Sequence, residues 1–367
     1  MGNKISKLQV SNFRNLQGDI IHFGAKINCI FGENGNGKTN ILEAIYVLAL
    51  KKSFRKNSSF PQFLGIDGEK PEIIISSVFH DKNNEAFSYS ARLLQDSSEW
   101  SVNGKPVKKR PEIALVFVNP SDAYQFHNQS SFRRSWFDQH IGMLDSEYKK
   151  LLSKYTTILR NRNTLLSKKP SHYHQQLDVL DEMMASTSFE ILEKRKHFIA
   201  EIGGFCKQAF QDVFSENHEL KISLESKFLN CSVEQIQKIL QENRPKEELM
   251  GFTKNGIHKD DYVLLFDGYN SYEFCSLGQQ KMSYLSLLFA YVELFRYKFM
   301  SFPIVLIDDV SGELDSERWQ RLVHFLERSQ FQVLITTANE KFKEELDKIE
   351  GAQKIIVHAG TIITPAE

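Results

Sequence analysis

The sequence has few cysteines and no long hydrophobic run, and both absences narrow what the protein can be. Its four cysteines are scattered over 367 residues, without the spacing of a metal site or of a disulfide framework. They indicate a reducing compartment. No apolar stretch approaches the roughly 18 residues of a membrane-spanning helix. The nearest, residues 284–295, is short and contains Glu293. We therefore expect a cytoplasmic protein with no membrane partner.

The sequence also lacks net charge, which bears on nucleic-acid binding. The chain has 46 basic and 46 acidic side chains, so its overall field does not attract a polyanion. Nucleic-acid binding would require local basic patches. The pair Arg160 and Arg162 is expected on a solvated helix face. The other basic clusters are Lys51, Lys52, Arg55 and Lys56; Lys108 and Arg110; and Arg133 and Arg134.

What the sequence does contain is a phosphate-binding loop of the pattern G-x-x-x-x-G-K-[ST]. An apolar run at residues 27–31, expected to be a strand, precedes it, and apolar residues at helical spacing follow it. In this context backbone N–H groups and a helix N-terminus hold a nucleoside triphosphate, Lys38 reaches the β- and γ-phosphates, and Thr39 ligates Mg²⁺. The predicted loop residues are Gly32, Glu33, Asn34, Gly35, Asn36, Gly37, Lys38 and Thr39.

A second element of the same site is predicted far along the chain. The apolar run at residues 304–307 ends in Asp308 and Asp309. A buried strand of this kind presents Asp308 at its carboxyl end to hold Mg²⁺, and Asp309 is placed to orient or deprotonate the attacking water. The sequence therefore predicts one nucleotide site whose two halves are separated by a long insertion.

The remaining pattern suggests three parts. Residues 1–120 hold the phosphate loop and an antiparallel meander with strands at 72–80, 86–94 and 100–102 and a tight Asn103-Gly104 turn. Residues 121–249 are expected to form an inserted helical lobe, with long helices over 148–166 and 177–213. Residues 250–367 return to the nucleotide-binding half, with strands at 262–266 and 272–275 and the acidic strand.

Between the two halves of the predicted site, residues 276–279 read Ser-Leu-Gly-Gln and open a long apolar helix. They resemble the signature loop of ABC-type ATPases. The order phosphate loop, signature and acidic strand predicts an α/β fold: an ABC-type ATPase head with a mixed sheet, an antiparallel β subdomain and the helical lobe. The resemblance implies an ATP-dependent homodimer in which Ser276, Gly278 and Gln279 contact the nucleotide of the second copy.

The motifs as a set resemble the RecF family of bacterial recombination-repair ATPases, which are related to SMC proteins. The resemblance covers nearly the whole chain in the expected order. Its motifs are Asn12 to Asn15, Gly37 to Ile45, Lys52 to Arg55, Arg133-Arg134 with Phe137-Asp138, Arg160 to Asn163, Gly256 to Asp261, Ser276 to Gln280 and Asp308 to Asp315.

The resemblance implies a weak, Mg²⁺-dependent ATPase stimulated by DNA, which binds duplex and gapped DNA and helps to load a recombinase. It implies RecR and RecO as partners. It adds Arg14, Asn40 and Asp315 to the nucleotide-binding residues, and it strengthens the expectation that the basic clusters contact DNA phosphates.

Departures from the family pattern keep alternatives open. Ile257, Lys259, Leu277, Lys281 and Gly312 replace residues that are common in the family, and a lysine in place of arginine loses bidentate phosphate recognition. A RecF-like defence or scaffold protein with little turnover is therefore a second hypothesis. A third is the ATPase subunit of an ABC-type transporter. The insertion at residues 121–249 and Thr336-Thr337 in place of a switch histidine argue against this third hypothesis.

Overall fold

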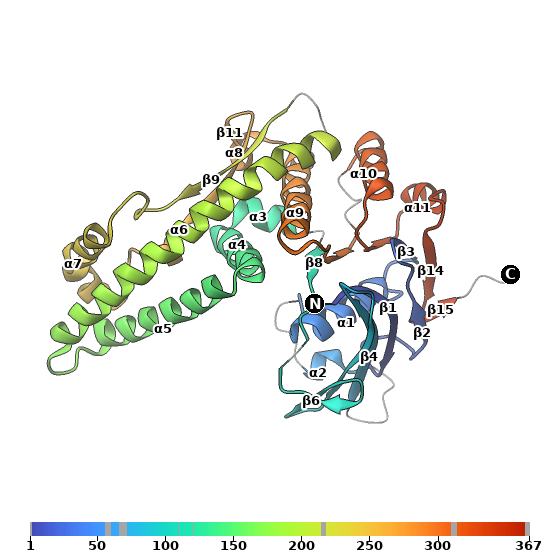
Figure 1. Cartoon of the computed structure of the whole chain (residues 1–367), viewed down its shortest axis with the longest axis horizontal. Helices are drawn as coiled ribbons and strands as arrows, with labels where there is room; N and C mark the ends of the chain where they lie inside the picture. The colour runs from blue at the N-terminus through green and yellow to red at the C-terminus, as the bar shows by residue number, and fades with distance from the viewer. Residues whose placement is uncertain are drawn as a thin grey trace. The chain divides into compact units, whose positions relative to one another are not determined.

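A computed structural model of the chain describes residues 2–55, 60–65, 72–109, 111–119, 121–213, 218–309 and 314–363. The chain divides into two compact units, which we describe one at a time (Figure 1). Unit 1 comprises Met1–Asp122, Asp212–Phe214 and Phe295–Glu367, and unit 2 comprises Ala123–Gln211 and Ser215–Leu294. The first unit boundary lies at residue 122, and residues 250–294 lie in unit 2.

Unit 1 contains a six-stranded sheet of order β15-β14-β3-β13-β12-β8, in which every neighbouring pair except β14–β15 is parallel. Parallel strands end at a common edge, so the loop after β3 and the acidic pair after β12 meet there, with the end of β13 between them. The strands are β3 (Ile27–Phe31), β8 (Leu115–Val118), β12 (Ile304–Ile307), β13 (Val333–Thr337), β14 (Gln353–His358) and β15 (Thr361–Ile363).

A second six-stranded sheet in unit 1 is antiparallel and confirms the predicted meander. The turn predicted at Asn103-Gly104 joins β6 to β7 with φ angles of 49° and 73°, the left-handed values that tight hairpin turns require. The strand order is β2-β1-β4-β5-β6-β7. Their bounds are β1 (Gly2–Ser11), β2 (Ile20–His22), β4 (Ile73–Asp81), β5 (Ala86–Leu93), β6 (Ser98–Val102) and β7 (Lys105–Pro106).

Helix α1 (Lys38–Leu50) packs on β13 of the parallel sheet and on β4 and β5 of the antiparallel sheet. Residues 41–49 are all buried, because the helix has a sheet on more than one side and needs no polar face. The core of unit 1 therefore surrounds the helix that begins at the phosphate loop. The other helices of unit 1 are α2 (Phe60–Phe63), α10 (Ser316–Arg328) and α11 (Glu340–Asp347).

Unit 2 is mainly helical and confirms the two long helices as α5 and α6. The strand β9 (Leu220–Glu225) lies inside the segment that we expected to be helical; it pairs with β10 (Asp261–Phe266), and this non-local pairing explains why residues after 250 join unit 2. The helices are α3 (Asp122–Asn128), α4 (Ser130–Leu144), α5 (Ser146–Lys168), α6 (Tyr173–Val213), α7 (Val233–Met250), the short η1 (Ile257–Lys259), α8 (Ser271–Phe274) and α9 (Leu277–Phe299).

The strand predicted at residues 272–275 is wrong. After β11 (Tyr269–Asn270) the chain forms the single helical turn α8. The Asn270 side chain accepts a hydrogen bond from the backbone N–H of Tyr272 at 3.0 Å, and Cys275 donates to the carbonyl of Ser271 at 3.2 Å. An asparagine at the N-cap thus outweighs the strand propensity of the aromatic residues that follow.

Candidate functional site

The phosphate loop connects β3 to α1 as the sequence predicts. Its glycines at 32, 35 and 37 have φ angles of 155°, 86° and 109°, which side chains disfavour. A Cβ atom on Gly32 would lie 2.4 Å from the carbonyl oxygen of Val357. The Lys38 ammonium donates to the carbonyl oxygens of Gly32 and Glu33 at 2.7 and 2.9 Å, which keeps its charge within the curve of the loop.

Two neighbouring segments hold this loop from outside, and no motif in the sequence predicts the second. Asn15 donates to the carbonyl of Gly35 at 2.9 Å and accepts from the Asn40 side chain at 2.7 Å. At the β14–β15 turn, the N–H of Gly360 donates to the carbonyl of Asn36 at 2.9 Å. The curvature of the loop therefore depends on contacts from both ends of the chain.

A substitution at Gly360 tests this support. Gly360 has a φ of 82°, and a Cβ atom there would meet the Asn15 carbonyl oxygen at 1.6 Å, a clash with backbone. We expect Gly360→Ala to lower the free energy of unfolding by about 2 kcal/mol more than Gly351→Ala and to weaken ATP binding. Gly351 is a matched control because its φ is 76° and nothing lies within 4 Å of the added atom.

Urea unfolding and ATP titration of both variants measure these effects. If Gly360→Ala bound ATP as tightly as Gly351→Ala, the turn would not shape the loop.

The acidic pair meets the loop at the carboxyl edge of the parallel sheet. The Thr39 hydroxyl donates to Asp308 Oδ1 at 2.9 Å, and the Thr336 hydroxyl donates to the same oxygen at 2.7 Å. Asp308 is 6% exposed. Burial raises the pKa of Asp308, and the hydroxyls of Thr336 and Thr39 oppose the shift. In the sequence Thr336 stands where a transporter ATPase has its switch histidine; in the fold its hydroxyl orients the predicted metal ligand.

These donors fit Mg²⁺. A hydroxyl and a carboxylate lie 2.9 Å apart at the mouth of the loop, and Mg²⁺ is bound by one or two such oxygens together with substrate phosphates and waters. A cation would also relieve the cost of the buried carboxylate. No cluster of three His, Cys, Asp or Glu side chains able to hold a metal occurs in the described ranges.

Asp309 follows on the same edge. Its backbone N–H donates to the Thr336 hydroxyl at 3.0 Å, and its φ is 30°. Thr336 therefore holds both acidic residues, one through its hydroxyl proton and the other through its lone pair. Burial lowers the pKa of the Lys38 ammonium, while Asp309 and Asp308 raise it, so Lys38 and the two carboxylates act on one another electrostatically.

The predicted residues Arg14, Asn40 and Arg55 form a network around Glu43, a carboxylate on α1 whose side chain is 0% exposed. Arg14 pairs with Glu43 at 2.8 Å, and Arg55 pairs with it at 3.0 Å. Arg55 also donates to the Asn40 side chain at 2.9 Å. These contacts tie the segment after α1 to the first turn of that helix. Glu43, which the sequence analysis did not single out, joins the two arginines to α1.

The predicted signature segment lies in unit 2 at the start of α9. The Ser276 hydroxyl accepts from the N–H of Gln279 at 3.3 Å, and the Ser276 N–H donates to Gln279 Oε1 at 2.9 Å, a capping box. Ser276 and Leu277 are exposed. Because the Ser276 hydroxyl oxygen accepts the hydrogen bond in this capping box, its proton can still be donated to another group.

Asp315, which the resemblance assigns to the nucleotide, is the N-cap of α10. Its side chain accepts a hydrogen bond from the backbone N–H of Arg318 at 2.9 Å.

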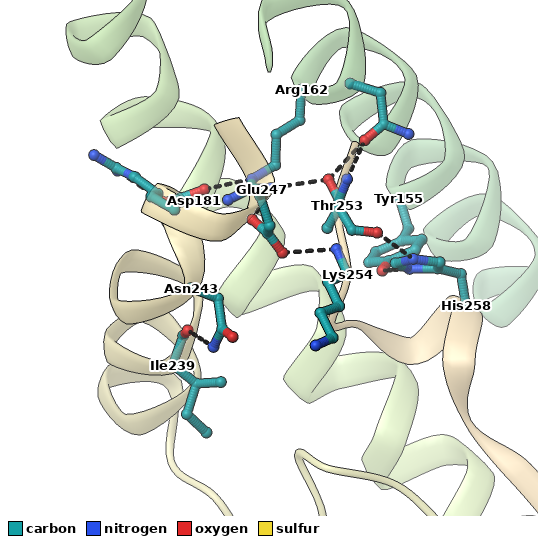
Figure 2. Close-up of polar contacts among 11 residues, drawn as sticks. Tyr155, Arg162, Asp181, Ile239, Asn243, Glu247, Thr253, Lys254 and His258 are labelled. Carbon is teal, nitrogen blue, oxygen red and sulfur yellow. Dashed lines mark hydrogen bonds and ion pairs between the residues drawn. The ribbon is translucent and has the colours of Figure 1, made fainter. Parts of the chain in front are cut away.

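The segment Gly256 to Asp261, for which the sequence suggested no role, is a structural hub of unit 2. His258 Nδ1 lies 2.8 Å from the Tyr155 hydroxyl on α5, and Figure 2 shows this pair beside the polar network that precedes the segment. The buried Arg195 on α6 pairs with Asp260 at 2.6 Å and donates to the carbonyl of Ile257 at 3.0 Å. The segment fastens α5 and α6 to β10.

The basic clusters differ in their surroundings. Arg162 is 0% exposed and pairs with Asp181 and Glu247, so the expectation of a solvated face is wrong for it. Arg133 forms a bidentate pair with Asp261 at 2.7 Å, and Arg134 donates to the carbonyl of Asp260 at 2.9 Å. Their guanidinium groups thus hold the hub. Lys56 and Arg110 lie outside the described residues.

Comparison with known proteins identifies the family. Residues 4–358 match the model of the RecF/RecN/SMC N terminal domain. A DNA replication and repair protein RecF of Azobacteroides pseudotrichonymphae genomovar. CFP2 is 31% identical to the chain over 98% of both sequences. The chain belongs to the RecF family. The RecF of Bacteroides fragilis strain YCH46 is 29% identical over 94% of this chain and 92% of its own.

Solved structures confirm the fold of this RecF-family chain. A structure described as the recombination mediator protein RecF-ATPrS in the RecFOR pathway superposes with a TM-score of 0.85 at 24% identity, covering 100% of this chain and 99% of that one. An Smc head domain from Pyrococcus furiosus gives a TM-score of 0.58 at 16% identity, covering 98% and 94%. The predicted ABC-type head is confirmed, and the curated relatives that match nearly the whole chain are named as proteins of DNA replication and repair. No described helix is long and apolar enough to cross a bilayer.

Proposed function

We propose that this RecF-family chain is a slow Mg²⁺-dependent ATPase whose ATP-bound form is a homodimer that binds duplex or gapped DNA during recombinational repair. The observation that carries the proposal is the set formed by Thr39, Asp308 and Thr336, which joins the phosphate loop to the acidic strand at distances of 2.7 and 2.9 Å. A hydroxyl and a buried carboxylate placed at a phosphate loop are the parts that nucleotide hydrolysis requires.

Each residue receives a role from its position. The loop N–H groups and Lys38 hold the phosphates, and Lys38 balances the charge that develops on the γ-phosphate. Thr39 and Asp308 hold Mg²⁺, which screens the phosphate charge when bound. Asp309 orients or deprotonates the attacking water. Thr336, bonded to both acidic residues, fixes the distance between metal ligand and base.

The signature segment supplies the other half of each site in the dimer. Ser276 and Leu277 are exposed at the N-terminus of a long helix, where N–H groups and the helix dipole favour an anion. We propose that Ser276, Gly278 and Gln279 of one copy contact the γ-phosphate held by the loop of the other. Hydrolysis then removes the contacts that join the copies.

Association with DNA, RecR and RecO is proposed on family membership. The RecF of known structure is described as a recombination mediator in the RecFOR pathway, and the same role for this chain is consistent with its site. Lys51, Lys52 and Lys108 are our first candidates for DNA contacts, because their side chains are exposed on unit 1. A cytoplasmic location remains the prediction of the sequence.

The oligomeric state of the full chain tests the proposal. We expect a smaller species with ADP, a dimer with ATP, and a dimer bound to DNA with ATP and a gapped duplex, as measured by light scattering after gel filtration. Lys38→Ala should stay in the smaller form under all three conditions. A wild-type chain that shows no change of mass with ATP and no ATP-dependent DNA binding at low salt would contradict it.

A further inference from the structure

Two adjoining cavities lie on unit 1 beside the antiparallel sheet, and none of the residues assigned to the nucleotide lines them. Their volumes are about 760 and 1030 Å³, close to the range of roughly 300–1,000 Å³ in which small ligands bind. Both are lined by Lys51, Ser98 and Trp100. They therefore form one continuous depression, which we call the Trp100 groove, with the indole and Lys51 at its centre.

The groove brings together basic segments that are distant in the sequence. Lys51 and Lys52 follow the last residue of α1, whereas Lys108 follows β7. The end of α1 reaches this place because the helix packs on β4 and β5, and β5 pairs with β6, with Ala91 opposite Trp100. The segment after β7 reaches it because β6 pairs with β7, with Pro106 opposite Ser101. Trp100 itself is placed by sheet register, a rigid framework for a binding site.

Trp100 is held at the centre of the groove by its neighbours. Its indole N–H donates to the Ser98 hydroxyl at 2.9 Å. The ring stacks on buried Tyr89 at a centroid distance of 5.7 Å and an interplanar angle of 30°. The Lys51 ammonium lies over the ring, 4.3 Å from its centroid. The indole is half-buried, so part of the ring stays accessible in a fixed orientation.

The charges of the lining favour a polyanion. The groove has five basic side chains, Lys51, Lys52, Arg55, Arg92 and Lys108, and two acidic ones, Asp96 and Glu99. Arg55 pairs with Glu43, and Arg92 with Glu72. We assign the phosphate contacts to Lys51, Lys52 and Lys108, whose side chains are exposed and long enough to follow a backbone. In a chain of zero net charge, this is a local concentration of positive charge around an aromatic ring.

We propose that the Trp100 groove binds a short run of unpaired DNA nucleotides, with a base stacked on Trp100 and the neighbouring phosphates on Lys51, Lys52 and Lys108. The inference rests on the proposed DNA-binding function and adds where an unpaired strand is held. A duplex cannot make the stacking contact with Trp100, because its bases are stacked on one another and present no open face to the indole.

The energies are consistent with displacement of Lys51 from the ring. A base stacked on an aromatic side chain is held more strongly than an exposed cation over the same ring. A base can therefore replace the ammonium over Trp100, and the ammonium then reaches a phosphate beside that base. Lys51 thus exchanges its contact with the indole ring for an ion pair with a phosphate.

The test uses the full chain with ATP and two labelled probes, an oligothymidylate of about 16 nucleotides and a blunt duplex, with binding measured by fluorescence anisotropy. We expect Trp100→Ala to weaken oligothymidylate binding about tenfold while duplex affinity changes less than about twofold. Trp100→Phe, which keeps an aromatic face, should lose less. Lys51→Ala should reduce the slope of log affinity against log salt by about 0.7 for the oligothymidylate.

Lys82→Ala is the matched charge control, because Lys82 is exposed in the β4–β5 turn, at the end of that hairpin away from Ala91 and Trp100. It should bind both probes as the wild type does. Circular dichroism melting checks that the Trp100 variants fold.

If Trp100→Ala bound the oligothymidylate normally, or lost affinity for both probes equally, the groove assignment would be wrong. A wild-type chain that binds the duplex with ATP but not the oligothymidylate also overturns it and leaves the proposed function standing. Binding of neither probe would overturn both.

Discussion

Asp309→Asn is expected to lower the rate of ATP hydrolysis by about 100-fold or more, the usual contribution of a general base, while ATP binding persists. The two carboxylates at the edge of the parallel sheet have different surroundings. Asp308 accepts hydrogen bonds from Thr39 and Thr336 and is buried, so we assign it to Mg²⁺ binding. Asp309 is more exposed and has its backbone fixed by Thr336. Asparagine keeps its shape and cannot accept a proton from water.

The consequence for the proposed dimer is specific. If hydrolysis reopens the dimer, Asp309→Asn should accumulate it with ATP, and light scattering should show a stable dimer where the wild type shows a transient one. Asp347→Asn is the control, because it removes the same charge from the exposed end of α11 and should hydrolyse ATP normally. Full hydrolysis by Asp309→Asn would remove Asp309 from the catalytic role.

Arg162→Met is expected to destabilise the chain by about 3–5 kcal/mol, the cost of leaving buried charges without their partner. Arg162 bonds Asp181 at 2.6 Å, and Glu247 and Thr253 at 2.7 and 2.8 Å. Figure 2 shows its side chain among these groups. Methionine fills similar space but takes the guanidinium away from Glu247, which is 0% exposed, and leaves the buried Asp181 with Arg244 alone of its two arginines. The network joins α5, α6 and α7, so its loss should loosen unit 2.

Arg160→Met provides the comparison, because Arg160 lies on the same helix two positions away and is exposed. That change should stay within about 0.5 kcal/mol of the wild type. Urea unfolding followed by far-ultraviolet circular dichroism reports the difference, because the signal is dominated by the helices. Equal stability of the two variants would show that the buried network contributes nothing to the fold.

The loss of Arg162 should also weaken the contacts that hold the hub, residues 256–261, in place. Glu247 accepts from the backbone N–H of Lys254 at 2.7 Å, and Thr253 bonds the Asn163 side chain at 2.7 Å. These contacts fix the chain just before the segment that fastens α5 and α6 to β10. Helix α9, which begins at the proposed signature segment, follows β10 by about ten residues in this chain. We therefore expect a loosened hub to disturb that segment while the phosphate loop is unchanged.

Sequence patterns predicted those parts of the site that are contiguous. The phosphate loop needs glycines, a lysine and a threonine at fixed spacing, and the acidic strand needs apolar residues before a carboxylate, so both can be read directly. The long helices of unit 2 were predicted by their periodicity. The strand β9 was not, because its stability depends on β10, which follows it by more than thirty residues. The α8 turn was missed because one asparagine cap outweighed a run of aromatic residues.

The sequence by itself determined the chemistry that we propose for this protein: a loop from Gly32 to Thr39 for a triphosphate, Asp308 as a metal ligand, and Ser276 in the signature segment. Only the tertiary structure decided which residues support that chemistry. Thr336 bonds both acidic residues because β13 lies between β3 and β12. Gly360, in the β14–β15 turn, hydrogen-bonds the phosphate loop at Asn36. The register of β6 and β7 brings Lys108 close to Trp100. Each is a contact between residues distant in sequence, and such contacts leave no local pattern to read.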